Sequence, residues 1–179
     1  MNRKFALLSL ICLACASRLP AQTRTREDTE SCQRFTQAFY NWYVAKVFQS
    51  FHDKNADPLL EGLDYKGHPF SRGLVQGIRK VRAEEVKSHG AILDFDPILN
   101  SQDPAEHYLV RNVTEKDGRY LAEIYGVWHT PPSDLRKGPQ VVAEIIYRQG
   151  RWVFVNFHYP GSPFPESENL VSILKSALR

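Results

Sequence analysis

The segment VVAEIIYRQGRWVFVNFHYP, residues Val141–Pro160, is the most strongly patterned stretch of this 179-residue chain. Two runs rich in β-branched and aromatic residues lie on either side of Gln149 and Gly150. Glycine at the second position of a two-residue loop tolerates the positive φ that a primed hairpin turn requires. The sequence therefore predicts a β-hairpin in which Arg148 lies opposite Arg151.

Counting pairs outward from this turn assigns every side chain of the hairpin to one of two faces. The first face is predicted to carry Tyr147/Trp152, Ile145/Phe154, Ala143/Asn156 and Val141/His158, and the second Ile146/Val153, Glu144/Val155 and Val142/Phe157. Both faces are mostly apolar, which is typical of strands that are covered on both sides. Glu144 and His158 are the exceptions, and this register places them on opposite faces. A hydrogen-bonded structural role competes with a functional one for both residues.

A second hairpin is predicted immediately before the first. Residues Tyr108–Val113 and Arg119–His129 are rich in strand-forming residues and flank Asp117-Gly118, another primed-turn sequence. Alternation is expected to place one set of side chains on one face: Tyr108, Val110, Leu121, Glu123, Tyr125, Val127 and His129. The opposite face is expected to carry the other set: Leu109, Val113, Tyr120, Ala122, Ile124 and Trp128.

Helices are predicted on both sides of the strands, from apolar residues at helical spacing. Thr29 is expected to cap a first helix that ends near Phe51. Its apolar stripe is expected to pack in the core, with a ligand cavity as the alternative: Cys32, Phe35, Phe39, Trp42 and Val47. A short helix is expected at Pro58–Leu63, and Ser167 is expected to cap a terminal helix. A longer helix is expected from Ser71 to Gly90, with its own stripe of Leu74, Ile78, Val81 and Val86.

The N-terminus has the pattern of a secretory signal peptide. Arg3 and Lys4 precede an apolar run that is shorter than the roughly 20 residues of a membrane span. We therefore predict a signal peptide at residues 1–21, a flexible lead-in at 22–30 and a single α+β domain at 31–179. The predicted location is secreted or periplasmic without a transmembrane span, and a lipid anchor at Cys15 is the alternative because the preceding residues resemble a lipobox.

Removal of this segment changes the charge and the cysteine content of the chain. The whole chain has 23 Lys and Arg against 20 Asp and Glu, but three of the basic residues and none of the acidic ones precede Gln22. The mature chain is therefore neutral, which argues against nucleic acid as a partner. Cys32 then has no intramolecular partner, and it is expected to be a small core residue, with pairing to another protein as the alternative.

Oxygen-bearing side chains crowd the segment ILDFDPILNSQDPAEHY, residues 92–108. Ca²⁺ ligation is one hypothesis, but the spacing differs from that of an EF-hand loop. Local turn chemistry, in which such side chains bond nearby amides, is the preferred interpretation. No metal or cofactor is assigned, and four residues are retained as candidate ligand contacts: Asp94, Asp96, Asn100 and Asp103.

The order of predicted elements indicates an α+β fold, in which a curved antiparallel sheet of about four strands packs against N-terminal helices and is followed by a C-terminal helix. Three strings resemble a bacterial envelope domain of unknown function typified by YbjP-like lipoproteins: FTQAFYNWYV (35–44), LDFDPILNSQDP (93–104) and GRWVFVNFHYP (150–160). The resemblance spans residues 32–178 and implies an envelope location and a cystatin-like, or nuclear-transport-factor-like, cone. It implies no catalytic residues.

Three functions remain open at this point. A non-catalytic domain that binds a small molecule or an envelope protein is preferred, because the sequence contains none of the usual metalloprotease, hydrolase or phosphate-binding motifs. The alternative is a cone-fold isomerase, dehydratase or hydrolase with a carboxylate or His in an apolar pocket. Its candidate side chains are Glu123, Tyr125, His129, Glu144 and His158, and Asn156 is a further polar strand residue that is available to such a pocket. A periplasmic immunity-type inhibitor of a cell-wall-acting toxin is the second alternative.

Overall fold

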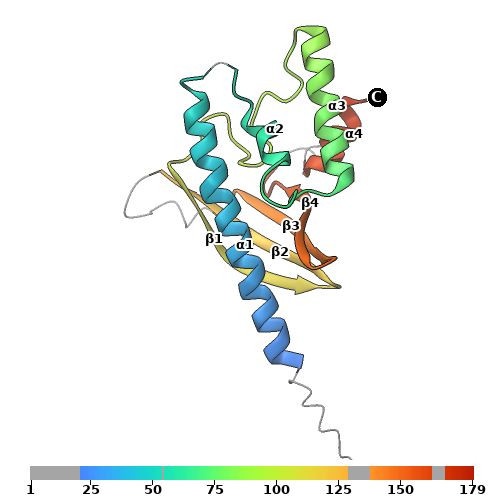
Figure 1. The fold of residues 1–179 in the computed structure, drawn as a ribbon. Helices are drawn as coiled ribbons and strands as arrows, with labels where there is room; N and C mark the ends of the chain where they lie inside the picture. The colour runs from blue at the N-terminus through green and yellow to red at the C-terminus, as the bar shows by residue number, and fades with distance from the viewer. Residues whose placement is uncertain (1–20, 54, 129–137, 163–167) are drawn as a thin grey trace, which may run out of the picture.

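The computed structural model describes residues 21–53, 55–128, 138–162 and 168–179, with side chains from residue 27 onward. The chain has the predicted α+β fold, shown in Figure 1. Its helices are α1 (Ala21–Ser50), α2 (Pro58–Leu63), α3 (Arg72–Ser88) and α4 (Leu170–Ala177). Its strands are β1 (His107–Lys116), β2 (Arg119–Val127), β3 (Val141–Arg148) and β4 (Arg151–His158), and they form one antiparallel sheet in the order β1-β2-β3-β4.

Both predicted hairpin turns are confirmed. Asp117 and Gly118 have φ values of 54° and 74°, and Gln149 and Gly150 have values of 52° and 78°. Two consecutive positive φ angles are what a type I′ turn requires, and this turn matches the natural twist of the flanking strands. The turns therefore start both hairpins in the expected register, with Lys116 opposite Arg119 and Arg148 opposite Arg151.

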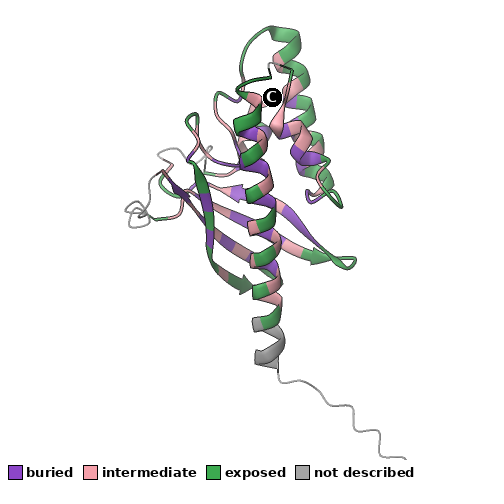
Figure 2. Ribbon diagram, turned by 60° about the vertical axis from the view of Figure 1, so that its left-hand side comes forward, coloured by how far each residue is buried: buried purple, intermediate pink, exposed green. Residues whose placement is uncertain are grey.

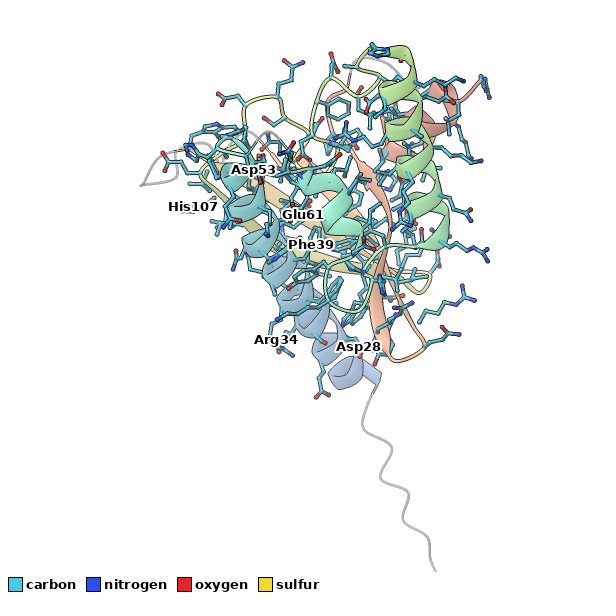
Figure 3. All side chains as sticks on the ribbon, turned by 45° about the horizontal axis from the view of Figure 1, so that its top comes forward. Asp28, Arg34, Phe39, Asp53, Glu61 and His107 are labelled. Atoms are coloured by element: carbon cyan, nitrogen blue, oxygen red, sulfur yellow. The ribbon has the colours of Figure 1, made fainter. Side chains whose placement is uncertain are left out.

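The hydrophobic core lies between the sheet and the helices, and aromatic side chains from the stripe on α1 fill it. Phe39 is fully buried and packs against Phe70 and Phe154, with ring centroids 5.5 and 5.0 Å away. Figure 3 shows Phe39 among the side chains gathered between α1, α2 and the sheet, and Figure 2 shows α1 lying across the sheet, with many buried residues along the strands. The stripe is therefore core, and Cys32 is a buried free thiol within it.

Side chains and loop backbone cover parts of both edges of the sheet. At β1, the amide of Gln37 accepts from Val110 N at 2.8 Å and donates to Tyr108 O at 2.9 Å, and Gln33 donates to Val110 O at 2.9 Å. At β4, Phe154 N donates to Pro69 O at 2.7 Å. A partner strand cannot add at these positions, because their backbone groups are already bonded.

Three details of the helices differ from the sequence prediction. α1 begins at Ala21, so residues 22–30 are helical and the expected cap at Thr29 is wrong. α3 is capped by Ser71 as predicted, but Val86 is 77% exposed and lies outside the buried stripe. α4 is capped by Asn169, whose side chain accepts from Ser172 N, whereas Ser167 lies outside the described residues.

A β-bulge in β1 changes the predicted faces of the first hairpin. The register shifts between Val110 and Val113, so that Val110 pairs with Ile124 and Tyr108 pairs with Gly126. Tyr108 and Val110 therefore lie on the buried face with Ile124, and Leu109 lies on the opposite face, where it is 39% exposed. The predicted faces of β1 before the bulge are wrong because one extra residue reverses the alternation.

A second bulge, in β4, has the larger consequence. From the turn to the pair Ile145/Phe154 the predicted register is confirmed, but Glu144 then pairs with Asn156, Ala143 with Phe157 and Val142 with His158. Val155 is the extra residue. Glu144 and His158 consequently lie on the same face of the sheet, and their predicted placement on opposite faces is wrong.

Candidate functional site on the open face of the sheet

The residues that the β4 bulge brings together form a hydrogen-bonded cluster on the face of the sheet that is turned away from α1. His158 Nε2 lies 2.9 Å from Glu144 Oε2, and Arg119 Nη1 contacts Glu144 Oε1. Glu144 comes from β3, His158 from β4 and Arg119 from β2, so three strands build the cluster. The Glu144 side chain is 11% exposed, whereas those of His158 and Arg119 are 39% and 60% exposed.

The cluster stabilises the ionised form of Glu144. Burial raises the pKa of this carboxyl, but the hydrogen bonds and charges of His158 and Arg119 outweigh burial and hold the pKa below its usual value. An ionised carboxylate only accepts hydrogen bonds, so the protonated Nε2 of His158 faces it. The arrangement orients the imidazole and leaves most of the guanidinium exposed to solvent.

This cluster forms one wall of a shallow cavity of about 470 Å³, which we call the sheet depression. Two apolar side chains, Leu121 and Val142, are partly exposed in it. The charged residues of its lining are Lys116, Asp117, Arg119 and Glu144, together with His158. Small-molecule sites are typically lined by apolar surface with a few polar groups that converge on the ligand, and the lining of the sheet depression has this composition.

A second polar group lies on the same face, close to the sheet depression. Glu123 Oε2 accepts from Asn112 Nδ2 at 2.7 Å and from Tyr125 Oη at 3.0 Å. Burial and the Glu123 carboxylate raise the pKa of Tyr125, and the Arg111 guanidinium lies 5.9 Å from its ring centroid. Glu123 pairs with Val142, which pairs with His158, so these residues follow one row across three strands. His129, the fifth candidate, lies outside the described residues.

The acidic segment between α3 and β1 has a different role in the structure. Asp96 Oδ1 accepts from Ile98 N and Leu99 N at 2.8 and 3.0 Å, and Asp96 Oδ2 accepts from Tyr43 Oη at 2.8 Å. Both oxygens of Asp96 are therefore engaged within the fold, in the turn chemistry expected of this segment.

The remaining candidates of that segment do not converge on one point. Asp94 and Asp103 are exposed, and Asn100 Nδ2 donates to Gln140 O at 3.2 Å. Within the described ranges, no three His, Cys, Asp or Glu residues are grouped so that they could hold a metal ion. The structure therefore gathers Glu144 and His158, and separately Glu123 and Tyr125. Of the four acidic-segment candidates, Asp94 and Asp96 line one cavity of about 540 Å³, whereas Asn100 and Asp103 lie outside its lining.

Arg119 is the residue of the cluster that the sequence analysis does not identify. Its contact with Glu144 depends on the register between the two hairpins, and in the sequence Arg119 is only the first residue of a predicted strand. Asn156 bonds the loop and helix beyond the bulge: its Oδ1 accepts from Phe157 N and Val171 N at 3.0 and 3.1 Å. Asn is depleted in strand interiors, so Asn156 was the available signal of an irregularity.

The chain was compared with family models, with curated proteins and with solved structures, and none of them matches it. None of the helices in the described part of the chain combines the length and apolarity needed to cross a membrane.

Proposed function

We propose that this chain is a secreted or periplasmic binding domain that holds a small organic anion in the sheet depression. The proposed location rests on the signal-peptide pattern of residues 1–21 and on the resemblance to the envelope domain. One observation carries the proposed binding site: Arg119 and His158 are oriented by Glu144 beside partly exposed Leu121 and Val142.

The ligand class follows from the groups that face the sheet depression. A guanidinium has five N–H donors, and the exposed Arg119 has donors left after its contact with Glu144. Lys116 adds a second cation to the lining. A carboxylate or phosphate would form charge-assisted hydrogen bonds with these groups, and an apolar body would cover Leu121 and Val142.

Isothermal titration of the purified protein with a panel of aliphatic and aromatic carboxylates and phosphates tests the proposed site. Arg119→Gln should weaken binding about tenfold or more, because it removes a charge-assisted hydrogen bond. Arg148→Gln is the matched control, since Arg148 is an exposed residue of β3 outside the lining of the sheet depression. The proposed site would be contradicted if affinity fell equally in the two variants, or if no compound of the panel bound to the native protein.

A catalytic function is the second candidate, and the 2.9 Å contact between His158 and Glu144 favours it. An imidazole oriented by a carboxylate is the usual general base of hydrolytic enzymes. We rank this candidate second because the sheet depression is shallow and, among the residues that the structure describes, its lining includes no Ser, Cys or Thr nucleophile. The two candidates differ in one measurement: a bound ligand that is recovered unchanged supports a binding domain, whereas turnover that His158→Gln abolishes supports an enzyme.

The location is tested separately from the ligand. A fusion of residues 1–30 to an alkaline phosphatase that is active only after export should give activity in a bacterial host. Replacing one of the two positive residues and interrupting the apolar run, with Arg3→Glu and Leu8→Asp, should abolish that activity. Phosphatase activity that is equally low for both fusions would contradict export.

A further inference from the structure

A second cavity lies between α3 and α4, and its lining shares no residue with that of the sheet depression. Its volume is about 260 Å³, and its walls are largely apolar. Gly73 and Leu74 of α3 form one wall, Val171, Leu174 and Leu178 of the α4 region form the other, and Val155 of β4 forms part of the lining between them. We call this cavity the α3–α4 groove.

Two glycines explain why the groove is open at one end. A Cβ at Gly77 would lie 2.9 Å from Leu174 Cδ1, so α4 touches the backbone of α3 there. A Cβ at Gly73, one helical turn earlier, would have no other atom within 4 Å. Residues four apart share one face of a helix, so α3 presents a closed contact at Gly77 and open space at Gly73.

The β4 bulge supplies the lining between the helices. Val155 is the extra residue of the bulge, and it lines the groove rather than the sheet depression. Asn156, the next residue, holds the start of α4 in place, because its side chain bonds Val171 N and Asn169 Oδ1 at 3.1 Å each. The groove is therefore a consequence of the same irregularity that joins Glu144 to His158.

The polar groups of the groove lie at two places. Ser71 uses its Oγ to cap α3, accepting from Leu74 N at 3.4 Å, and is committed to the fold. Lys175 is exposed on α4, and among the described residues it is the charged side chain of the lining. An apolar channel with a cation at its mouth matches a ligand that has an alkyl chain and an anionic head group.

We propose that the α3–α4 groove binds the alkyl chain of a single-chain anionic amphiphile, with the head group at Lys175. The lining residues of α3 and its N-cap, from Ser71 to Gly77, span about 9 Å, which is less than the two or more turns over which a partner helix is recognised. A stable dimer buries roughly 1,200 Å² or more, which a groove of this size does not supply. This site is separate from the sheet depression and does not depend on the function proposed for it.

The test uses the full mature protein after removal of bound lipid, and ligands that share one eight-carbon chain, which matches the length of the groove. Octanoate and octanoyl lysophosphatidylglycerol carry anionic heads, and monooctanoylglycerol carries a neutral head. Each is titrated below its micelle concentration by calorimetry, at a pH where the carboxylate is ionised. We expect one bound molecule per chain for the anionic ligands. Binding of one anionic ligand alone supports the site and identifies the head group.

Gly73→Leu is the decisive variant. The new side chain enters open space and occupies the groove, so affinity for all three ligands should fall about tenfold or more. Glycine is the poorest helix former except proline, so the melting temperature should stay the same or rise. Gln76→Leu adds the same side chain at an exposed position outside the groove and should leave binding unchanged.

Lys175→Gln tests the position of the head group. Affinity for the two anionic ligands should fall roughly threefold to fivefold, and affinity for the neutral one should not change. Arg119→Gln should leave the affinity for the neutral ligand unchanged, which separates this site from the sheet depression, because that ligand has no anionic group for Arg119 to bind. Absence of binding by every alkyl ligand, or equal affinity in the Gly73→Leu variant and the native protein, would overturn the proposal. Dimerisation that Gly73→Leu abolishes, without alkyl binding, would overturn it in favour of a second copy.

Discussion

The two halves of the β3–β4 hairpin differ in the geometry of their strand pairing. The half next to the turn, from Ile145 to Phe154, is regular and places Ile145 and Phe154 fully in the core. The distal half contains the bulge at Val155 and carries Glu144, Asn156 and His158. The regular half stabilises the fold, and the bulged half positions the polar cluster and the start of α4. A turn therefore determines the register only as far as the first bulge.

The two halves should differ most in how much the free energy of unfolding falls when one side chain of each half is shortened to alanine. Phe154 is fully buried against Phe39, Phe70 and Phe157, so Phe154→Ala should cost about 3–5 kcal/mol of unfolding free energy. Val155 lines an existing groove and is only partly buried, so Val155→Ala should cost less than about 1 kcal/mol. Urea denaturation of both variants measures the difference, and equal costs would remove the distinction between the halves.

The next largest effect should come from Glu144 in the bulged half. Glu144→Gln removes the charge that orients Arg119 and His158, and should cost about 1.5–3 kcal/mol at pH 7. The pKa of Glu144 is lowered in the folded protein, so its contribution is present above the unfolded pKa and is lost as pH falls through the folded pKa. The difference in unfolding free energy between variant and native protein should therefore shrink below about pH 4. A difference that is constant from pH 7 to pH 3 would show that the charge does not matter.

Asn156 should have a smaller effect that spreads to α4. Asn156→Ala removes the side-chain acceptor of Val171 N and one of the two donors to Asn169 Oδ1, which still accepts from Ser172 N, and it should cost about 1–2 kcal/mol. Hydrogen exchange should increase first in α4, because its start loses an anchor. Arg148→Ala in the regular half is the control and should change stability by less than about 0.5 kcal/mol. Uniform exchange across the whole chain would show that Asn156 does not anchor α4 specifically.

The smallest expected change in the free energy of unfolding is a stabilisation, and it should come from a substitution in the turn. Gln149 has a φ of 52°, which is unfavourable for most side chains and well tolerated by Asn. Gln149→Asn creates the Asn-Gly sequence preferred in type I′ turns and should stabilise the protein by about 0.5–1 kcal/mol. Ligand affinity should not change, because the turn controls the regular half alone. A changed affinity would indicate that the two halves are coupled.

The sequence was sufficient to predict the turns, caps and short helix that depend on the chemistry of neighbouring residues. Proline at the start of Pro58–Leu63, Ser71 as a cap and the two glycine-containing turns each require one conformation, and the structure has all of them. The fold class followed from the order of these elements. The face predictions failed where a bulge intervened, because side-chain alternation contains no information about an extra residue.

The candidate site could be predicted in its residues but not in its geometry. Glu144 and His158 stood out as polar residues in apolar strands, yet the unbulged register separated them. Arg119 could not be placed beside Glu144, because the pairing of β2 with β3 spans the segment 128–140 and no turn specifies it. Asp96 stood out for its charge, but its partner Tyr43 lies 53 residues away on α1.

The central claim is that the bulge at Val155 places His158 opposite Val142. Engineered disulfides test it directly, in a mature chain whose Cys32 is replaced by Ser. Directly opposed residues of antiparallel strands have Cα atoms about 4.5–5.5 Å apart, within the range of a disulfide. We predict that Val142→Cys with His158→Cys cross-links efficiently under mild oxidation, and that Val141→Cys with His158→Cys does not. The reverse result would mean that the hairpin keeps the unbulged register, with Glu144 and His158 on opposite faces.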